Sequence, residues 1–223
     1  MRPILSVLFD LDGTLLDRRT TFRRHLELQI ERHPAMFPHA QTASYVAQLL
    51  ELDQNGTRNR SEFYDRVERE LGLARGSAAE LREDFEVHFP ESCAPFPNVF
   101  ATLQTLRDHG LKLGLITNGR ELIQGRKIER LGIRPYLDAV VISETVGVRK
   151  PDPRIFSAAL ADLGVEASAA AHVGDDPDAD VLGAKRSGLL AVWRRDSFWP
   201  EPAAADRIID DLAELPAIVL ESG

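Results

Sequence analysis

The first apolar run of the chain, ILSVLF at residues 4–9, has the length and composition of a buried β-strand. An acidic stretch, DLDGTLLD at residues 10–17, follows it directly and carries three aspartates. Carboxylates beside a core strand are costly to bury unless a cation or a chemical role compensates for the lost hydration. The start of the chain therefore predicts a buried strand that ends in an acidic turn.

Residues 18 to about 92 follow a helical period. Charged and apolar residues recur at helical spacing, for example in SEFYDRVERELGL (61–73) and SAAELREDFEVHF (77–89), without strand-like alternation. Ser61 and Ser77 are expected to cap two of these helices, since serine is a favoured N-cap residue. This block is predicted to be an all-helical unit.

Helical and strand-like segments alternate from Pro95 onward, a pattern typical of a parallel sheet covered on both faces. We predict an α/β fold, with a Rossmann-like parallel-sheet core from residues 1–17 and 94–223 and an all-helical domain inserted at 18–93. Residues 206–210 are expected to add an edge strand. The other expected strands are 111–117, 137–143, 168–174 and 189–194, and the expected helices are 99–110, 121–132, 153–164 and 178–188.

Polar side chains stand at the carboxyl ends of the predicted strands, the edge at which open parallel sheets bind ligands. They are Asp10, Asp12 and Thr14 after the first strand, Thr117, Asn118 and Gly119 after the second, Lys150 after the third, and Asp175, Asp176 and Asp180 after the fourth. Groups that are far apart in the sequence are thus expected to meet at one rim. The helical insertion begins just after the first acidic cluster. It is therefore expected to lie above this rim, where it could act as a lid.

This set of groups suits the chemistry of phosphate esters. Several carboxylates at one edge repel one another unless a cation lies among them, and oxygen-only ligands favour Mg²⁺. A lysine, a hydroxyl and the backbone amides of glycine turns supply the positive charge and the donors that a phosphate needs. A carboxylate can act as a nucleophile, and an aspartate two residues later faces the same side of an extended strand end, which suits general acid–base catalysis on the leaving oxygen.

The segments DLDGT, ITN, RKPDP and GDDPDAD stand in this order along nearly the whole chain. They resemble the motifs of the haloacid dehalogenase-like (HAD) hydrolase superfamily, and the helical insertion resembles its small helical (C1-type) cap. The resemblance implies that Asp10 is the nucleophile that becomes phosphorylated and also binds Mg²⁺, and that Asp12 is the general acid–base, with its backbone carbonyl on the metal. It further implies that the Thr117 hydroxyl holds the phosphate, with donors from Asn118 and Gly119.

The third and fourth motifs carry the remaining charges. By resemblance, Lys150 neutralises the nucleophile and the phosphate, and Asp175 is the principal acidic metal ligand. Asp176 binds the metal directly or through water, and Asp180 fits a supporting position. Taken singly, each acidic or glycine-containing segment also fits a turn or a helix cap. Their combination at one edge is what favours a catalytic site.

Asp12 distinguishes among the reactions of this superfamily. A dehalogenase needs the nucleophile but no acid, because halide leaves without a proton, and the family's dehalogenases carry another residue at this position. A phosphonatase would need a Schiff-base lysine from its cap, and residues 18–92 contain no lysine. We therefore expect a Mg²⁺-dependent phosphatase that hydrolyses a small-molecule phosphate monoester through an aspartyl-phosphate. A sugar-phosphate mutase of the same fold and a non-catalytic metal- or ligand-binding module are the alternatives.

The substrate stays open at this point among nucleoside monophosphates, acylneuraminate phosphates, sugar phosphates and phosphoglycolate. A polar loop in ELDQNGTRNRSEFYDR (51–66) carries Arg58 and Arg60, and Arg120 directly follows the second motif. These arginines are candidate contacts for an anionic substrate, although each also fits a solvated turn.

Composition narrows the choice of partners. The net charge of −8 argues against a nucleic-acid partner, because proteins that bind nucleic acid usually have a basic surface. The single cysteine, Cys93, excludes an intramolecular disulfide and a cysteine-rich metal site. The sequence shows neither the h-region of a signal peptide nor an apolar stretch of about 20 residues for a membrane span. We expect a cytoplasmic monomer or homodimer whose partner is a small phosphorylated metabolite.

Overall fold

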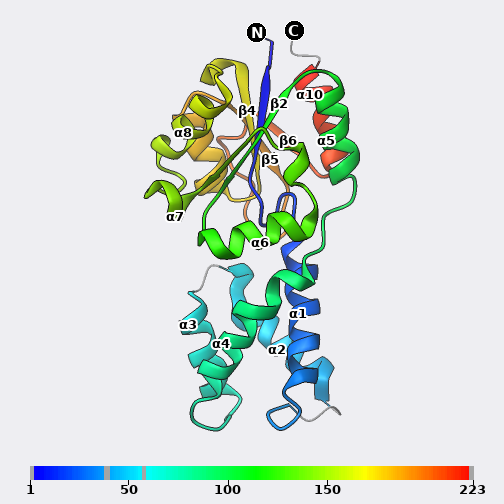
Figure 1. Cartoon of the computed structure of the whole chain (residues 1–223), viewed down its shortest axis with the longest axis vertical. Coiled ribbons are helices and arrows are strands. Elements are labelled where there is room, and N and C mark those ends of the chain that lie inside the picture. The colour runs from blue at the N-terminus through cyan, green and yellow to red at the C-terminus, as the bar shows by residue number, and fades with distance from the viewer. Residues whose placement is uncertain (1–2, 38–40, 57–58, 221–223) are drawn as a thin grey trace. The chain divides into compact units, whose positions relative to one another are not determined.

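The computed structural model describes residues 3–37, 41–56 and 59–220 (Figure 1). Contacts divide the chain into two compact units, one made of residues 1–17 and 95–223 and the other of residues 18–94. The first unit contains a sheet with helices around it, and the second is helical. No helix among the described residues is long and apolar enough to cross a membrane.

A parallel six-stranded sheet forms the centre of the first unit. Its strands are β1 (Ser6–Phe9), β2 (Lys112–Thr117), β3 (Ala139–Ile142), β4 (Ala170–Gly174), β5 (Leu190–Arg194) and β6 (Arg207–Ile209). Their spatial order is β3-β2-β1-β4-β5-β6, so β1 lies between β2 and β4. The predicted α/β fold is confirmed, and the expected edge strand is β6.

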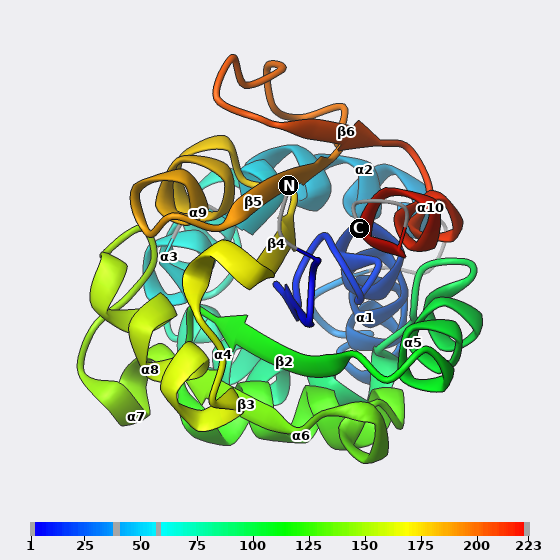
Figure 2. The same ribbon diagram turned by 90° about the horizontal axis from the view of Figure 1, so that it is seen from above.

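Helices cover both faces of this sheet, which explains why its central strands are apolar on both sides. Every residue of β1 and β4 is buried, as in other parallel sheets. The helices of this unit are α5 (Val99–Asp108), α6 (Glu121–Leu131), α7 (Ser143–Val146), α8 (Pro153–Leu163), α9 (Gly183–Arg186) and α10 (Leu215–Leu220). Figure 2 shows α8 and α9 on one face of the sheet and α5 and α10 on the other.

The helix expected at 178–188 is divided in the structure. A π-helical turn, Pro177–Leu182, comes first, and the short α9 follows it. The turn begins after Asp176, whose Oδ1 accepts hydrogen bonds from the amides of Asp178 and Ala179, both at 2.9 Å. Turns of this kind are common at functional sites, because they redirect a side chain without ending the helix.

The second unit consists of helices α1 (Arg18–Arg32), α2 (Thr42–Asp53), α3 (Arg60–Glu70) and α4 (Ser77–His88). Phe22, Phe63 and Phe85 belong to its buried apolar cluster. The two expected N-caps are wrong. Asn59 caps α3 by accepting from the Ser61 amide at 2.8 Å, and Gly76 occupies the cap position of α4, with a φ of 100°.

The chain leaves the first unit and returns to it at neighbouring points. Leu16 and Pro95 form an antiparallel β-bridge, and the Phe96 amide donates to the Leu15 carbonyl at 3.0 Å. These bonds lie within the first unit and tie its two pieces of chain together at the place where residues 18–94 are inserted.

Candidate active site

The sheet brings the first and fourth acidic loops together. Asp10 follows β1 and Asp175 follows β4, and these strands are direct neighbours. The Asp10 amide continues their ladder by donating to the Val173 carbonyl at 2.9 Å. Thr117 ends β2, on the other side of β1. The central strand therefore places Asp10 between the second and fourth motifs.

A buried lysine joins two of the carboxylates. Lys150 Nζ lies 2.5 Å from Asp10 Oδ1 and 2.6 Å from Asp180 Oδ1. Burial disfavours the charge on Lys150, but the two carboxylates outweigh burial and raise its pKa above the ordinary value. Lys150 is therefore a fixed cation beside the candidate nucleophile.

The Asp180 carboxylate contacts two further groups besides Lys150. Its Oδ1 also contacts His172 Nε2 at 2.9 Å, and its Oδ2 accepts from the Asp176 amide at 3.1 Å. Burial opposes ionisation, but Lys150 and His172 outweigh it and lower the pKa of Asp180 to about 2. Burial lowers the pKa of His172, so this histidine is neutral at pH 7 and donates its Nε2 proton. It is a packed neighbour of Asp180, as its position in a strand indicates.

Asp10 and Asp175 are less well compensated than Asp180. Burial raises the pKa of Asp10 to about 7, although Lys150 opposes this shift. Burial, followed by the charges of Asp10 and Asp180, raises the pKa of Asp175 well above its ordinary value. No described residue donates a hydrogen bond to the Asp175 carboxylate. Ionisation of both carboxyl groups would therefore place negative charge at this edge that the protein's own groups balance only in part.

The donor set fits a hard divalent cation. Asp10, Asp175 and Asp180 each offer a carboxylate oxygen within 4.8 Å of the others, and all three residues are buried. Both oxygens of Asp180 already have partners, since Oδ1 contacts Lys150 and His172 and Oδ2 accepts from the Asp176 amide. Asp10 and Asp175 are therefore the carboxylates best placed to be ligands. Oxygen-only donors of this kind suit Mg²⁺.

Two glycines make room for these carboxylates. Gly13 has a φ of +88°, and a Cβ there would lie 2.5 Å from the Asp175 carboxylate. A Cβ on Gly174 would lie 2.1 Å from Asp180 Cγ. Any side chain at either position would displace an acidic group, so the absence of a Cβ is part of the site.

Asp12 has different surroundings from Asp10. Lys127 Nζ lies 2.8 Å from each of its carboxylate oxygens, and Gln124 Nε2 donates to its Oδ2 at 3.0 Å. The same Gln124 nitrogen lies 2.5 Å from Thr117 Oγ1. Both partners come from α6, and neither is among the residues expected from the sequence motifs. The available signal is a pair of polar residues three positions apart in the helix that follows the second motif.

Asn118 and Gly119 use their donors within the protein. The Asn118 side chain accepts from the Lys150 amide at 2.9 Å and donates to the Lys150 carbonyl at 3.1 Å. The Gly119 amide donates to Ser143 Oγ at 3.0 Å. These contacts hold the loops that carry Thr117 and Lys150, and the expected role of Asn118 and Gly119 toward a phosphate stays a prediction.

The last two residues of β5 also contact the acidic loops. The Trp193 indole donates to the Asp175 carbonyl at 2.6 Å. Arg194 Nη1 donates to the Gly13 carbonyl at 3.0 Å, and its guanidinium lies 3.5 Å from the centre of the Phe96 ring. Both side chains are buried, and nothing in the sequence pattern distinguished them from ordinary strand residues.

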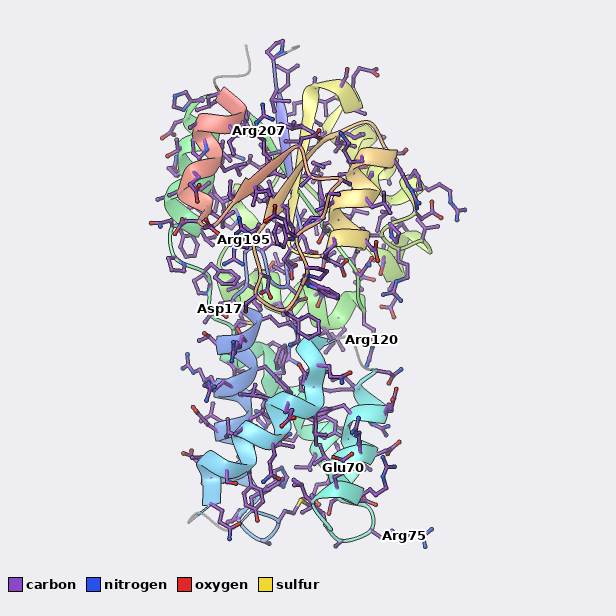
Figure 3. All side chains as sticks on the ribbon, turned by 180° about the vertical axis from the view of Figure 1, so that it is seen from behind. Asp17, Glu70, Arg75, Arg120, Arg195 and Arg207 are labelled. Atoms are coloured by element: carbon purple, nitrogen blue, oxygen red, sulfur yellow. The ribbon has the colours of Figure 1, made fainter. Side chains whose placement is uncertain are left out.

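The three arginines that the sequence suggests as substrate contacts have different surroundings. Arg58 lies outside the described residues. Arg60 pairs with Asp53 of its own helical unit at 2.5 Å and lies over aromatic rings, including that of Phe22 at 5.0 Å. Arg120, labelled in Figure 3, is exposed and stands directly before α6. These contacts of Arg60 lie within the helical unit, and a role for Arg60 and Arg120 toward substrate stays a prediction.

A family model and similar proteins of known name indicate the same family for this chain. Residues 4–188 match the model of the haloacid dehalogenase-like hydrolases. The chain is 33% identical over 231 residues to the glyceraldehyde 3-phosphate phosphatase of Methanopyrus kandleri, which covers 98% of this chain and 96% of that protein. It is also 33% identical over 235 residues to the ribulose-1,5-bisphosphate 5-phosphatase of Halopiger xanaduensis, covering 96% and 98% respectively.

A solved structure adds a relative with a different named activity. The 2-haloacid dehalogenase of Pseudomonas syringae pv. Tomato superposes with a TM-score of 0.66 at 31% identity, covering 99% of this chain and 100% of that chain. Similar proteins therefore include both named phosphatases and a named dehalogenase.

Proposed function

Because the chain belongs to the haloacid dehalogenase-like hydrolase family, we propose that it is a phosphatase that hydrolyses small phosphate monoesters through a phosphorylated aspartate. The observation that carries this proposal is the pair Asp10 and Asp12, two carboxylates two residues apart in different surroundings. Asp10 is paired with the buried Lys150, and Asp12 is held by α6. Such a separation of environments assigns different roles to two acids of the same kind.

In the first step, an Asp10 oxygen attacks phosphorus and the bond from phosphorus to the leaving oxygen breaks. Asp12 gives its proton to that oxygen, so an alcohol leaves and Asp10 carries the phosphoryl group. In the second step, Asp12 takes a proton from water, and the resulting hydroxide attacks phosphorus. Inorganic phosphate leaves, and Asp10 is restored as a carboxylate.

Lys150 and Thr117 hold the phosphoryl charge during both displacements. The ammonium of Lys150 already lies at Asp10, so it is placed beside the oxygens of a group that is bonded to Asp10. Thr117 ends the neighbouring strand and offers its hydroxyl at the same edge. Fixed donors in a buried site stabilise developing charge without having to reorganise.

Mg²⁺ is the cation that we propose for the acidic edge. Asp10 and Asp175 would hold it, together with the Asp12 carbonyl and Asp176, directly or through water. When bound, the ion neutralises phosphoryl oxygens and acts as a Lewis acid. The partly unbalanced charge on Asp10 and Asp175 supports this assignment.

Dehalogenation is the second candidate function, because one similar solved structure is that of a 2-haloacid dehalogenase. Asp12 argues against it, since halide needs no proton in order to leave. The two full-length relatives that are named phosphatases support the same choice. Their names give two different phosphorylated metabolites, so the substrate class proposed here is small phosphorylated metabolites.

The first prediction is phosphate release from a set of phosphorylated metabolites that includes sugar phosphates, nucleoside monophosphates and phosphoglycolate. Release should need Mg²⁺, stop on chelation, and fall by at least about 10³-fold in Asp10→Asn, because the nucleophile is lost. Circular dichroism of the variant verifies its fold. Activity retained in folded Asp10→Asn would contradict the mechanism, chloride release from 2-chloropropionate would favour the dehalogenase, and interconversion of sugar phosphates without release would favour the mutase.

A further inference from the structure

The buried face of α6 carries two polar side chains that point at reacting groups. Gln124 and Lys127 are three residues apart and therefore share a helix face. Their relative exposures are 2% and 6%, which is unusual for a glutamine and a lysine on a surface helix. Such burial is costly unless the polar groups are paired, and both residues contact Asp12.

We propose that Gln124 and Lys127 are positioning residues for the reaction: they orient the Asp12 carboxylate and the Thr117 hydroxyl from α6. The inference rests on the proposed function, because it assigns a task only if Asp12 and Thr117 act on a phosphate ester. It goes beyond that function by identifying which side chains set the directions of these two groups.

The donor pattern of Gln124 determines the direction of the Thr117 hydroxyl proton. A carboxylate only accepts hydrogen bonds, so the Gln124 group beside Asp12 is the amide NH₂ and not the carbonyl. The same nitrogen lies 2.5 Å from Thr117 Oγ1, which therefore accepts from it. The hydroxyl proton of Thr117 is left for another acceptor, and a phosphoryl oxygen is an acceptor of that kind.

Lys127 determines the orientation of the Asp12 carboxylate. Its Nζ lies 2.8 Å from both oxygens, and Gln124 holds one of the two from a second direction. Contacts to both oxygens restrict rotation of the carboxylate plane. An acid that must meet a leaving oxygen within hydrogen-bond distance benefits from such restriction, since misplacement of about 1 Å is costly to rate.

Gly119 supports this assignment independently. A Cβ on Gly119 would lie 2.8 Å from Gln124 Cγ and 3.0 Å from its Cδ. The glycine of the second motif thus leaves space for the Gln124 side chain, which is a further reason for its presence beside Thr117.

The test compares two substrates that differ in their need for an acid. An alkyl phosphate from the metabolite screen has a poor leaving group that needs a proton, whereas p-nitrophenyl phosphate releases p-nitrophenolate, which departs without protonation. The value of kcat/KM reports the steps up to departure of this group. A variant that misplaces Asp12 should therefore lose more kcat/KM on the alkyl phosphate than on p-nitrophenyl phosphate.

We expect Lys127→Met to lower kcat/KM about 10²-fold on the alkyl phosphate and less than about 10-fold on p-nitrophenyl phosphate. Lys127→Arg should recover most of the loss, because it restores a cation at Asp12. Gln124→Met, of similar size, should give the same difference between substrates and should also weaken inhibition by inorganic phosphate, since Thr117 loses its fixed direction. Arg130→Met removes a charge from an exposed position of the same helix and is the matched control.

An equal loss on both substrates in folded Lys127→Met and Gln124→Met, without recovery in Lys127→Arg, would overturn the inference. If Lys127→Met does not fold, Gln124→Met alone decides by the same comparison. Failure of the proposed function looks different: wild-type protein would release no phosphate from either substrate, or Asp10→Asn would remain active. The two failures are therefore distinguishable.

Discussion

Asp10 and Asp175 are buried carboxylates whose ionisation opposes folding when no cation is bound. Burial raises the pKa of Asp10 to about 7 and that of Asp175 well above its ordinary value. A carboxyl group with a pKa raised in the folded state stabilises the protein at pH values below its unfolded pKa. That contribution is lost as the pH rises through the folded pKa.

The metal-free protein should therefore lose stability from Asp10 as the pH rises from about 4 to about 7. The loss is at most about 4 kcal/mol, from a shift of roughly three pKa units. Urea unfolding in chelator, for wild type and Asp10→Asn, gives this contribution as a difference in slope against pH. Mg²⁺ should stabilise the wild type more at pH 7 than at pH 5. Parallel pH profiles of the two proteins would contradict this prediction.

The motif residues could be predicted from the sequence because each follows a strand end. Asp10, Thr117 and Asp175 lie at one edge as a consequence of parallel strand direction alone. Lys127 and Gln124 could not be predicted in this way. The helical period marks them as polar positions, but only the packing of α6 shows that they face Asp12. The contacts of the Asn118 side chain with the Lys150 backbone likewise appear only in the structure.

At the scale of elements, α1 places the imidazole ring of His25 in the aromatic core of the helical unit, where the ring finds no hydrogen-bond partner among the described residues. His25 is fully buried, and its ring lies 5.2 Å from that of Phe85 and 5.5 Å from that of Phe89. Neither ring nitrogen has a hydrogen-bond partner among the described residues. Burial lowers the pKa of His25 to about 3, so the ring is neutral in the folded protein at pH 7.

We expect His25→Phe to stabilise the protein by about 1 kcal/mol at pH 7, because an unpaired buried polar group is removed. The gain should increase as the pH falls from about 6.5 toward 3. In this range the unfolded histidine binds a proton that the folded one excludes, so the wild type loses stability. Urea unfolding at pH 7 and pH 5 measures both effects, and a variant less stable than wild type at pH 5 would contradict the argument.

Element boundaries show where local sequence reasoning fails. Serine is a good N-cap, yet Asn59 caps α3 and Ser61 lies inside it. The reason is that Asn59 reaches the Ser61 amide from an extended backbone, with a ψ of 137°. The sequence predicts ordinary helix at Pro177–Leu182, where the structure has a π turn, because the apolar spacing of a single turn does not reveal an extra residue.

For the whole molecule, the strands and their parallel arrangement were predictable, but their spatial order was not. Alternation of strands and helices gives direction and class. The order β3-β2-β1-β4-β5-β6 depends on which buried faces pack together, which only the tertiary structure shows. For the same reason, the contacts of Trp193 and Arg194 with the acidic loops appear only when β5 is placed beside β4.

The insertion point makes the core testable as a separate protein. Residues 1–17 joined to 95–223 by a short glycine–serine turn should fold, because Leu16 and Pro95 are already paired within this unit. Cooperative thermal unfolding, followed by circular dichroism, is the measurement. A shortened chain that stays unfolded would show that the sheet depends on residues 18–94.

The bridge between Leu16 and Pro95 has a consequence for how this protein can change over generations. Where a chain exits and re-enters a domain side by side, a whole segment can be gained, lost or exchanged without rethreading the sheet. In the course of evolution, residues 18–94 can therefore be exchanged as one unit, while the acidic residues at the edge of the sheet are retained.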